Sequence, residues 1–360
     1  MSGRKSIDIV LRPAPGRVAA TWSRRATRGL SGALAWAVAM GAGAGVARGE
    51  VDAKLGTKLD AVLSAFAGTG ATYVARVVEV ASGRELYLHD PDRAVAPASN
   101  AKLATTAAAL DRFGPGYVWR TYLATDGDDL WIVGTGDPAC GDRRIETAHG
   151  RKRMAILDDW ADALARRGVT RVTGKLMFDD GAFDDERVGA TWPRSELTEA
   201  WSAPLTGLTL NGSCIAVTAH PERLEVVPET QGVTLVNRTR KAGKPEALTI
   251  EREPAADTFT VKGLVTKPEE ASLKPIMDPG AFFADAVRTR LKARGITIDG
   301  RTERASRAAA KAKWGKLKDA DVRDGRVVAV HETSMVDVLG RTNKQSQNLF
   351  ADALCKLRAG

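Results

Sequence analysis

Apolar and polar positions along the chain predict a mixture of helices and strands. Residues 54–66 (KLGTKLDAVLSAF) place apolar side chains three and four positions apart, as in an amphipathic helix. Residues 73–80 (YVARVVEV) are rich in β-branched side chains and predict a strand. A second strand is expected at residues 85–88, after the turn residues Ser82 and Gly83. We therefore expect a helix followed by a hairpin in this part of the chain.

The next periodic stretch predicts a helix that starts near Ser99 and continues to residue 110. Pro97 precedes it, and its residues are mainly Ala, Leu and Thr. At a helix N-terminus the Ser99 hydroxyl can cap backbone N–H groups, and the helix dipole favours negative charge on oxygen. A small, apolar helix belongs in the centre of a domain, so we expect it to bury Lys102.

Later segments alternate between strands and helices without a fixed repeat. Amphipathic helices are expected at residues 158–167 and 278–294, each closed by a glycine. Residues 224–265 alternate short apolar runs with Thr, Glu and Gly, which predicts an all-β segment. Strands are also expected at 130–133, 172–178 and 327–330, and helices at 335–339 and 343–357.

Composition indicates how many domains the chain can form and argues against nucleic acid as a partner. A chain of 360 residues with 44% hydrophobic side chains can bury a core divided among two or three domains. Most of the net charge of +9 lies in residues 1–47. Beyond that segment, basic and acidic residues are mixed and lack interleaved aromatic side chains, so no nucleic-acid partner is expected.

Residues 1–49 have the organisation of a secretory signal peptide. An Arg-rich stretch ends at Arg28, residues 30–46 form a 17-residue run without charge, and small residues follow. The alternative is an N-terminal membrane anchor, because the run approaches the length of a membrane span. Its Ala- and Gly-rich composition favours cleavage. With either interpretation the folded part is exported to the periplasm or cell envelope.

Cysteines and histidines show no metal-binding spacing. Cys140, Cys214 and Cys355 are widely separated, no C-x-x-C occurs, and the four histidines are scattered. Neither a metal ion nor a cofactor is therefore expected. One disulfide with one free thiol and three free thiols are both compatible with the sequence.

Two short motifs carry candidate catalytic chemistry. Ser99 and Lys102 are three positions apart, so they share one face of a helix. A lysine shielded from water has a lowered pKa and can accept the serine proton. Near the end of the chain, Ser346 can relay a proton toward a leaving group, while Asn348 can bind a substrate amide and orient Lys102. The simpler alternatives are a capping Ser99 with an exposed Lys102, and a polar helix start at residues 346–348.

With these motifs, the chain resembles the class C low-molecular-mass penicillin-binding proteins. These are the D-alanyl-D-alanine carboxypeptidase/endopeptidases of the S13 peptidase group. The resemblance runs from about Leu55 to the last residue. The two serines lie 247 positions apart, whereas class A β-lactamases hold similar motifs much closer together. Its landmarks are PASNAK (97–102), VGTGDP (133–138), GKL (174–176) with Asp179-Asp180, SAP (202–204), DPGAF (278–282) and NKQSQNL (343–349).

The resemblance implies an α+β fold, in which a transpeptidase-like α/β sandwich is interrupted by smaller inserted domains. A split catalytic domain is expected at residues 50–121 and 326–360. A second domain is expected at 122–210 and 266–325, and a β-rich third domain at 211–265.

The resemblance further implies that Ser99 is the acylated nucleophile, Lys102 the general base, and Ser346 with Asn348 the second catalytic element. The implied substrate is the D-Ala-D-Ala end, or the cross-link, of peptidoglycan stem peptides. Covalent inhibition by β-lactams follows, because they mimic that acyl donor.

Two departures from the family pattern affect the expected activity. Gln347 stands where the family often has Asp. Lys-Thr-Gly or Lys-Ser-Gly, which normally provides a cation for the substrate carboxylate and an edge of the oxyanion hole, is absent from the sequence. We therefore expect a sandwich that is incomplete at the C-terminus, a chain shorter than the full protein, and weak or no catalysis. The alternative is a non-catalytic, cell-wall-binding pseudoenzyme of the same fold.

Overall fold

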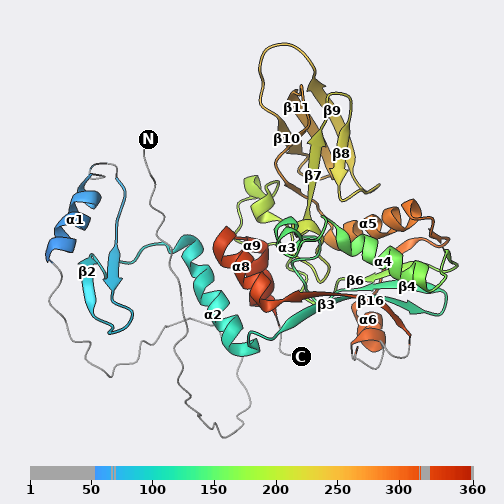
Figure 1. The fold of residues 1–360 in the computed structure, drawn as a ribbon, viewed down its shortest axis with the longest axis horizontal. Helices are drawn as coiled ribbons and strands as arrows, with labels where there is room; N and C mark the ends of the chain where they lie inside the picture. Colours follow the sequence, from blue (N-terminus) through green and yellow to red (C-terminus); the bar gives the residue numbers. More distant parts are fainter. Residues whose placement is uncertain (1–52, 66–67, 69, 316, 318–324, 358–360) are drawn as a thin grey trace, which may run out of the picture. The chain divides into compact units, whose positions relative to one another are not determined.

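The computed structural model describes residues 53–65, 68, 70–315, 317 and 325–357 (Figure 1). The predicted signal peptide lies outside the described residues. The chain divides into two compact units, Met1–Val95 and Ala96–Gly360. In the first unit a helix packs on an antiparallel hairpin, as predicted, and Tyr87 donates a 2.5 Å hydrogen bond to Asp60. Its elements are α1 (Ala53–Ser64), β1 (Ala75–Val78) and β2 (Glu85–His89).

A mixed sheet forms the centre of the second unit. β15, β6 and β4 run parallel, whereas β3 is antiparallel to both β4 and β16. The pairing of β3 with β16 joins segments that are far apart in the sequence. In the described part of the chain the strand order is β15 (Thr302–Arg304), β6 (Leu176–Asp179), β4 (Asp129–Val133), β3 (Val118–Asp126) and β16 (Val327–Ser334).

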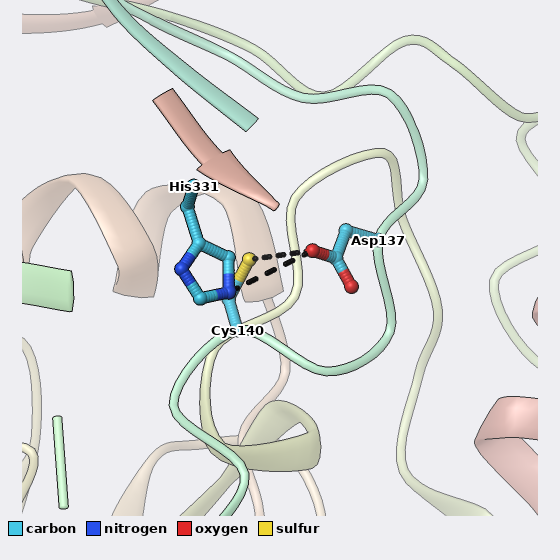
Figure 2. Close-up of side chains that lie close together, drawn as sticks. All are labelled: Asp137, Cys140 and His331. Atoms are coloured by element: carbon cyan, nitrogen blue, oxygen red, sulfur yellow. Dashed lines mark hydrogen bonds and ion pairs between the residues drawn. The ribbon is translucent and has the colours of Figure 1, made fainter. Parts of the chain in front are cut away.

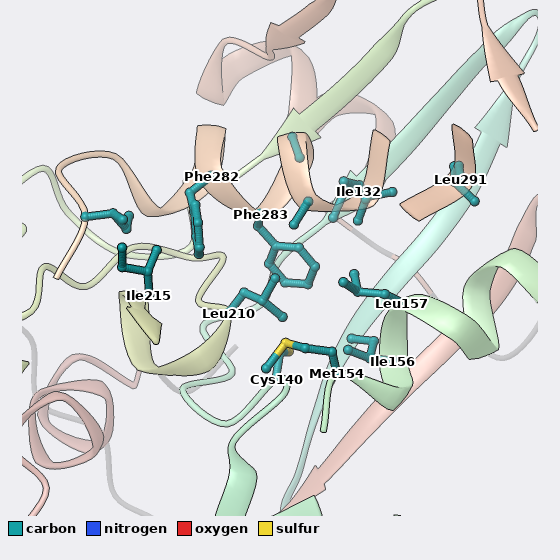
Figure 3. Packing of buried hydrophobic residues seen from close by; sticks show 14 of the residues in the cluster. Ile132, Cys140, Met154, Ile156, Leu157, Leu210, Ile215, Phe282, Phe283 and Leu291 are labelled. Carbon is teal, nitrogen blue, oxygen red and sulfur yellow. The ribbon is translucent and has the colours of Figure 1, made fainter. Parts of the chain in front are cut away.

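Helices cover both faces of this sheet. Successive strand residues point to opposite faces, and apolar side chains on both faces pack against these helices. On one face, α4 (Ala155–Arg166) and α5 (Pro279–Ala293) form the main core, where Trp160 stacks on Phe283 with ring centroids 5.7 Å apart. Figure 3 shows Phe283 in this core. On the other face, Trp314 of α6 (Arg307–Trp314) packs against Trp131.

A cluster of helices packs at one end of the sheet. It contains α2 (Ala101–Phe113), α8 (Met335–Gln345) and α9 (Asn348–Lys356), which lie side by side in Figure 1. Trp119 from β3 and Phe350 from α9 are among the buried side chains of its apolar core. α8 begins directly where β16 ends, and the Ser334 hydroxyl caps it by accepting from the Asp337 N–H at 3.1 Å.

Two sequence predictions about these helices are wrong. A single helix over residues 343–357 does not form, because Ser346 adopts a left-handed conformation (φ 55°) that ends α8 before α9 begins. α2 is not buried in a domain centre either. Among its residues only Thr106 and Ala109 are buried, and Leu103 is 59% exposed. Within the described residues, α8 and α9 cover one face of α2.

The predicted all-β segment is confirmed. β7 pairs with β8, β12 and β13, and β11 lies between β10 and β9. The bounds are β7 (Cys214–Ala219), β8 (Leu224–Val227), β9 (Thr234–Arg240), β10 (Thr249–Arg252), β11 (Thr258–Leu264), β12 (Glu269–Glu270) and β13 (Lys274–Pro275). The remaining elements are α3 (Arg143–Ala148), β5 (Arg171–Val172), β14 (Thr297–Ile298), η1 (Ala98–Asn100), η2 (Arg194–Glu196), η3 (Ala200–Ser202) and η4 (Asn211–Ser213).

The cysteines are free thiols, with Cys140 and Cys214 buried and Cys355 exposed. Among the described residues, none of the helices combines the length and apolarity needed to span a membrane. The expected three-part domain division stays a prediction.

Candidate active site

Ser99 lies where the 3-10 turn η1 passes into α2. The preceding residue, Ala98, has a positive φ of 46°, a conformation that costs an L-residue about 1–2 kcal/mol. The Ser99 hydroxyl does not cap the helix, since neither η1 nor α2 has a side-chain cap. It instead accepts hydrogen bonds from two other side chains of the site. The simpler interpretation of Ser99 as a capping residue is therefore wrong.

Lys102 follows Ser99 by one helical turn and connects the two motifs. Its Nζ lies 3.1 Å from Ser99 Oγ, 3.3 Å from Ser346 Oγ and 2.5 Å from Asn348 Oδ1. One amine therefore contacts three of the side-chain types that acyl transfer needs: a nucleophile, a relay hydroxyl and an amide.

Ser346 and Asn348 occupy the corner between α8 and α9. The left-handed backbone at Ser346 places its hydroxyl over α2, where Oγ donates to Ser99 Oγ at 2.7 Å. Asn348 uses both ends of its amide: Oδ1 accepts from Lys102, and Nδ2 donates to the Trp201 carbonyl oxygen at 3.0 Å. The structure thus brings all four predicted site residues together, although their catalytic roles stay predictions.

Two opposing effects act on the pKa of Lys102. Partial burial lowers the pKa of this amine, and the nearby Asp352 carboxylate opposes that effect. Burial also raises the pKa of Asp352, whose negative charge is favoured in turn by Lys356 and Lys102. A lysine with a lowered pKa can accept a proton at lower pH than a free lysine can. Ser99 and Ser346 are both exposed, so the site is open to solvent.

Sequence reasoning missed the residues that support this site. Thr106 of α2 hydrogen-bonds the Asn343 amide of α8, which ties the two helices together one turn beyond Lys102. Trp201 contributes its backbone carbonyl as the acceptor for Asn348, and Asp352 acts through its charge. Spacing one turn after Lys102 and after Asn348 could have indicated Thr106 and Asp352, but no sequence signal identifies a backbone acceptor.

A groove of about 910 Å³ adjoins Ser346 and Asn348, which is within the size range of ligand-binding pockets. Its lining includes Trp201, which is 52% exposed, and the exposed Arg144. Arg143 and Arg153 also line it, and both contact Glu270. The groove therefore offers both an aromatic surface and guanidinium groups next to the second serine.

A serine paired with a lysine one turn later, with Ser-x-Asn from a distant helix corner, has the residue types of the first two motifs of penicillin-recognising serine enzymes. Residues 55–359 match the D-Ala-D-Ala carboxypeptidase 3 (S13) family. The chain belongs to this family, and the resemblance inferred from the motifs is confirmed.

Two curated proteins and a solved structure resemble the chain. It is 29% identical over 333 residues to the D-alanyl-D-alanine carboxypeptidase of Actinomadura sp. (strain R39), covering 83% of this chain and 56% of that protein. It is 21% identical over 278 residues to the D-alanyl-D-alanine carboxypeptidase DacB of Haemophilus influenzae, covering 71% and 52%. The chain thus spans about half the length of these curated relatives.

The solved structure of penicillin binding protein 4 (dacB) from Haemophilus influenzae superposes with a TM-score of 0.54. At 17% identity it covers 78% of this chain and 61% of that one. This likeness shows the fold, and the expected α+β class is confirmed.

Proposed function

We propose that this chain is a serine D-Ala-D-Ala carboxypeptidase/endopeptidase that acts on peptidoglycan stem peptides through an acyl-enzyme at Ser99. The observation that carries the proposal is the position of Lys102 Nζ, within hydrogen-bond reach of Ser99, Ser346 and Asn348. Membership of the S13 family supports the same activity.

In the proposed reaction, uncharged Lys102 accepts the Ser99 hydroxyl proton while Oγ attacks the carbonyl carbon between the two D-Ala residues. The C–N bond then breaks, and the leaving amine takes a proton that passes from Lys102 through Ser346. Water hydrolyses the Ser99 ester and regenerates the hydroxyl. Asn348 holds Lys102 in place and is available to bind the substrate amide.

The groove beside Ser346 suits an anionic peptide, because Arg144 and its neighbouring arginines can pair with carboxylates. β-Lactams, which mimic the acyl donor, are proposed as covalent inhibitors at Ser99. Catalysis by these 360 residues is expected to be weak, because Lys-Thr-Gly is absent from them.

Fluorescent penicillin labelling tests the proposal directly. We expect slow covalent labelling of the chain, an adduct on the peptide containing Ser99, and loss of the label in Ser99→Ala. Ser195→Ala, which alters an exposed serine away from the motifs, is the matched control and should label normally. Labelling that persists in Ser99→Ala would overturn the proposal.

The second candidate is a cell-wall-binding pseudoenzyme of the same fold. This protein would sediment with purified peptidoglycan yet remain unlabelled by penicillin at any concentration tested. A label at Ser99 excludes it.

We also propose that the protein is exported to the periplasm or cell envelope, on the basis of residues 1–49. Cell fractionation with N-terminal sequencing of the mature protein separates a cleaved signal peptide from a retained membrane anchor.

A further inference from the structure

A second polar cluster lies away from the serine site, where the loop after β4 meets β16. It consists of Asp137 and Cys140 on the loop and His331 on the strand (Figure 2). Their ligand-type atoms all lie within 4.8 Å of one another. Asp137 Oδ2 is 3.5 Å from Cys140 Sγ and 3.9 Å from His331 Nε2. A carboxylate, a thiol and an imidazole are thus directed toward one point.

Asp137 needs a positive partner, because it is fully buried at 0% exposure. Its Oδ1 accepts from the Ala139 N–H at 2.8 Å, and its Oδ2 accepts from Thr333 Oγ1 at 2.7 Å. Within the described residues, His331 is the one basic side chain within 4 Å of this carboxylate. The other partners, Ala139, Thr333 and Cys140, give hydrogen bonds without positive charge, so a bound cation would neutralise this buried carboxylate.

Two of the three separations are near those around a metal ion, and the third, between Cys140 and His331, is at most 4.8 Å. A tetrahedral Zn²⁺ with bonds of about 2.0–2.3 Å to oxygen, nitrogen and sulfur holds its ligand atoms about 3.3–3.6 Å apart. The Asp137–Cys140 separation of 3.5 Å already fits, and the Asp137–His331 separation of 3.9 Å requires only a small rotation of the imidazole. Mixed thiolate, imidazole and carboxylate ligands suit Zn²⁺ better than Mg²⁺ or Ca²⁺.

The candidate ligands have hydrogen-bond partners of their own, as the ligands in metal sites usually do. Thr333 hydrogen-bonds Asp137, and Thr121 Oγ1 lies 3.4 Å from Cys140 Sγ. Asp137 and Cys140 thus each have a neighbouring hydroxyl that can hold them in orientation. Of the three residues, His331 lines a groove of about 760 Å³, together with Thr333. Water in that groove can therefore approach the cluster from the His331 side.

We propose that Asp137, Cys140 and His331 bind one divalent transition-metal ion, Zn²⁺ in particular, with water as the fourth ligand. Sequence spacing does not reveal this site, because His331 lies on β16, which reaches Asp137 and Cys140 only in the folded chain. The ion would join the β4 loop to β16, the strand that continues directly into α8 and so carries Ser346.

The test uses the full chain without a polyhistidine tag, stripped with a chelator and titrated with Co²⁺. We expect one equivalent to bind with a sulfur-to-cobalt absorption band, and Zn²⁺ to displace it. Cys140→Ser should remove the band, whereas Cys355→Ser, which alters the exposed thiol, should leave it unchanged.

His331→Gln keeps the thiol and alters a side chain near the surface, so it tests the site even if Cys140→Ser fails to fold. We expect it to weaken Co²⁺ binding at least about tenfold and to abolish the rise in melting temperature caused by Zn²⁺. No stoichiometric binding by the parent chain, or binding unchanged in His331→Gln, overturns the proposal. These readouts do not depend on penicillin labelling, so they are separate from the proposed activity.

Discussion

Lys102 Nζ and Asn348 Oδ1 lie 2.5 Å apart, which is the closest of the three contacts made by this amine. An amide oxygen accepts a hydrogen bond from both the charged and the neutral amine. A carboxylate at the same position would instead stabilise the ammonium form. An uncharged side chain at residue 348 is therefore expected to be as important for a low pKa of Lys102 as the shape of that side chain.

Asn348→Asp tests that expectation. The new carboxylate should raise the pKa of Lys102, reduce the fraction of neutral base, and lower penicillin acylation near pH 7 by about tenfold or more. The measurement is the rate of acylation as a function of pH. The rising limb of this pH profile should move to higher pH. Asn237→Asp alters an exposed amide of β9, away from the site, and is the control. An unchanged pH profile in Asn348→Asp would show that Lys102 is not the base.

Asp352 should have the opposite influence. Its charge raises the pKa of Lys102 against the lowering effect of burial. Asp352→Asn is therefore expected to lower that pKa further and move the rising limb of acylation to lower pH. The control is Asp111→Asn, which removes an exposed carboxylate from α2. A limb that moves to higher pH would contradict the assignment.

Ser346 combines the hydroxyl proposed to relay a proton with an unfavourable backbone conformation. Ser346→Gly and Ser346→Ala both remove the hydroxyl and should reduce acylation by about 10²-fold or more. Only glycine relieves the left-handed conformation (φ 55°), so Ser346→Gly should be more stable than Ser346→Ala by about 1 kcal/mol. Denaturant unfolding measures this difference. Equal stability of the two variants would mean that the corner relaxes in solution.

Arg341 is expected to hold α8 against α3. Its guanidinium lies 2.7 Å from Asp142, and the side chains are only 12% and 8% exposed. Arg341→Met leaves Asp142 buried without its cation and should cost about 3 kcal/mol of unfolding free energy. Arg143→Met is the matched control, because its ion pair with Glu270 is exposed and should be worth less than about 1 kcal/mol. A comparable loss in both variants would contradict this assignment.

Local spacing was sufficient for part of this structure and insufficient for the rest. Ser99 and Lys102 lie one helical turn apart, so their proximity follows from helix geometry alone. The break at Ser346 escaped prediction because neither Gly nor Pro marks it. Contacts such as Asn348 with the Trp201 carbonyl, or Asp137 with His331, arise from tertiary packing that periodicity does not encode. The S13 family and the α+β class were correctly predicted, because several dispersed motifs agreed.

The antiparallel pairing of β3 with β16 has a consequence for the order of folding. α2 and β3 leave the ribosome early, whereas β16, α8 and α9 appear only after residues 127–326 have been synthesised. Closing so long a loop is entropically costly until the intervening segments are compact. The nascent chain therefore carries Ser99 and Lys102 without Ser346 or Asn348 until more than 200 further residues have been added. Assembly of the four-residue site therefore waits for residues 346–348, and Ser99 lacks its hydrogen bond from Ser346 until then.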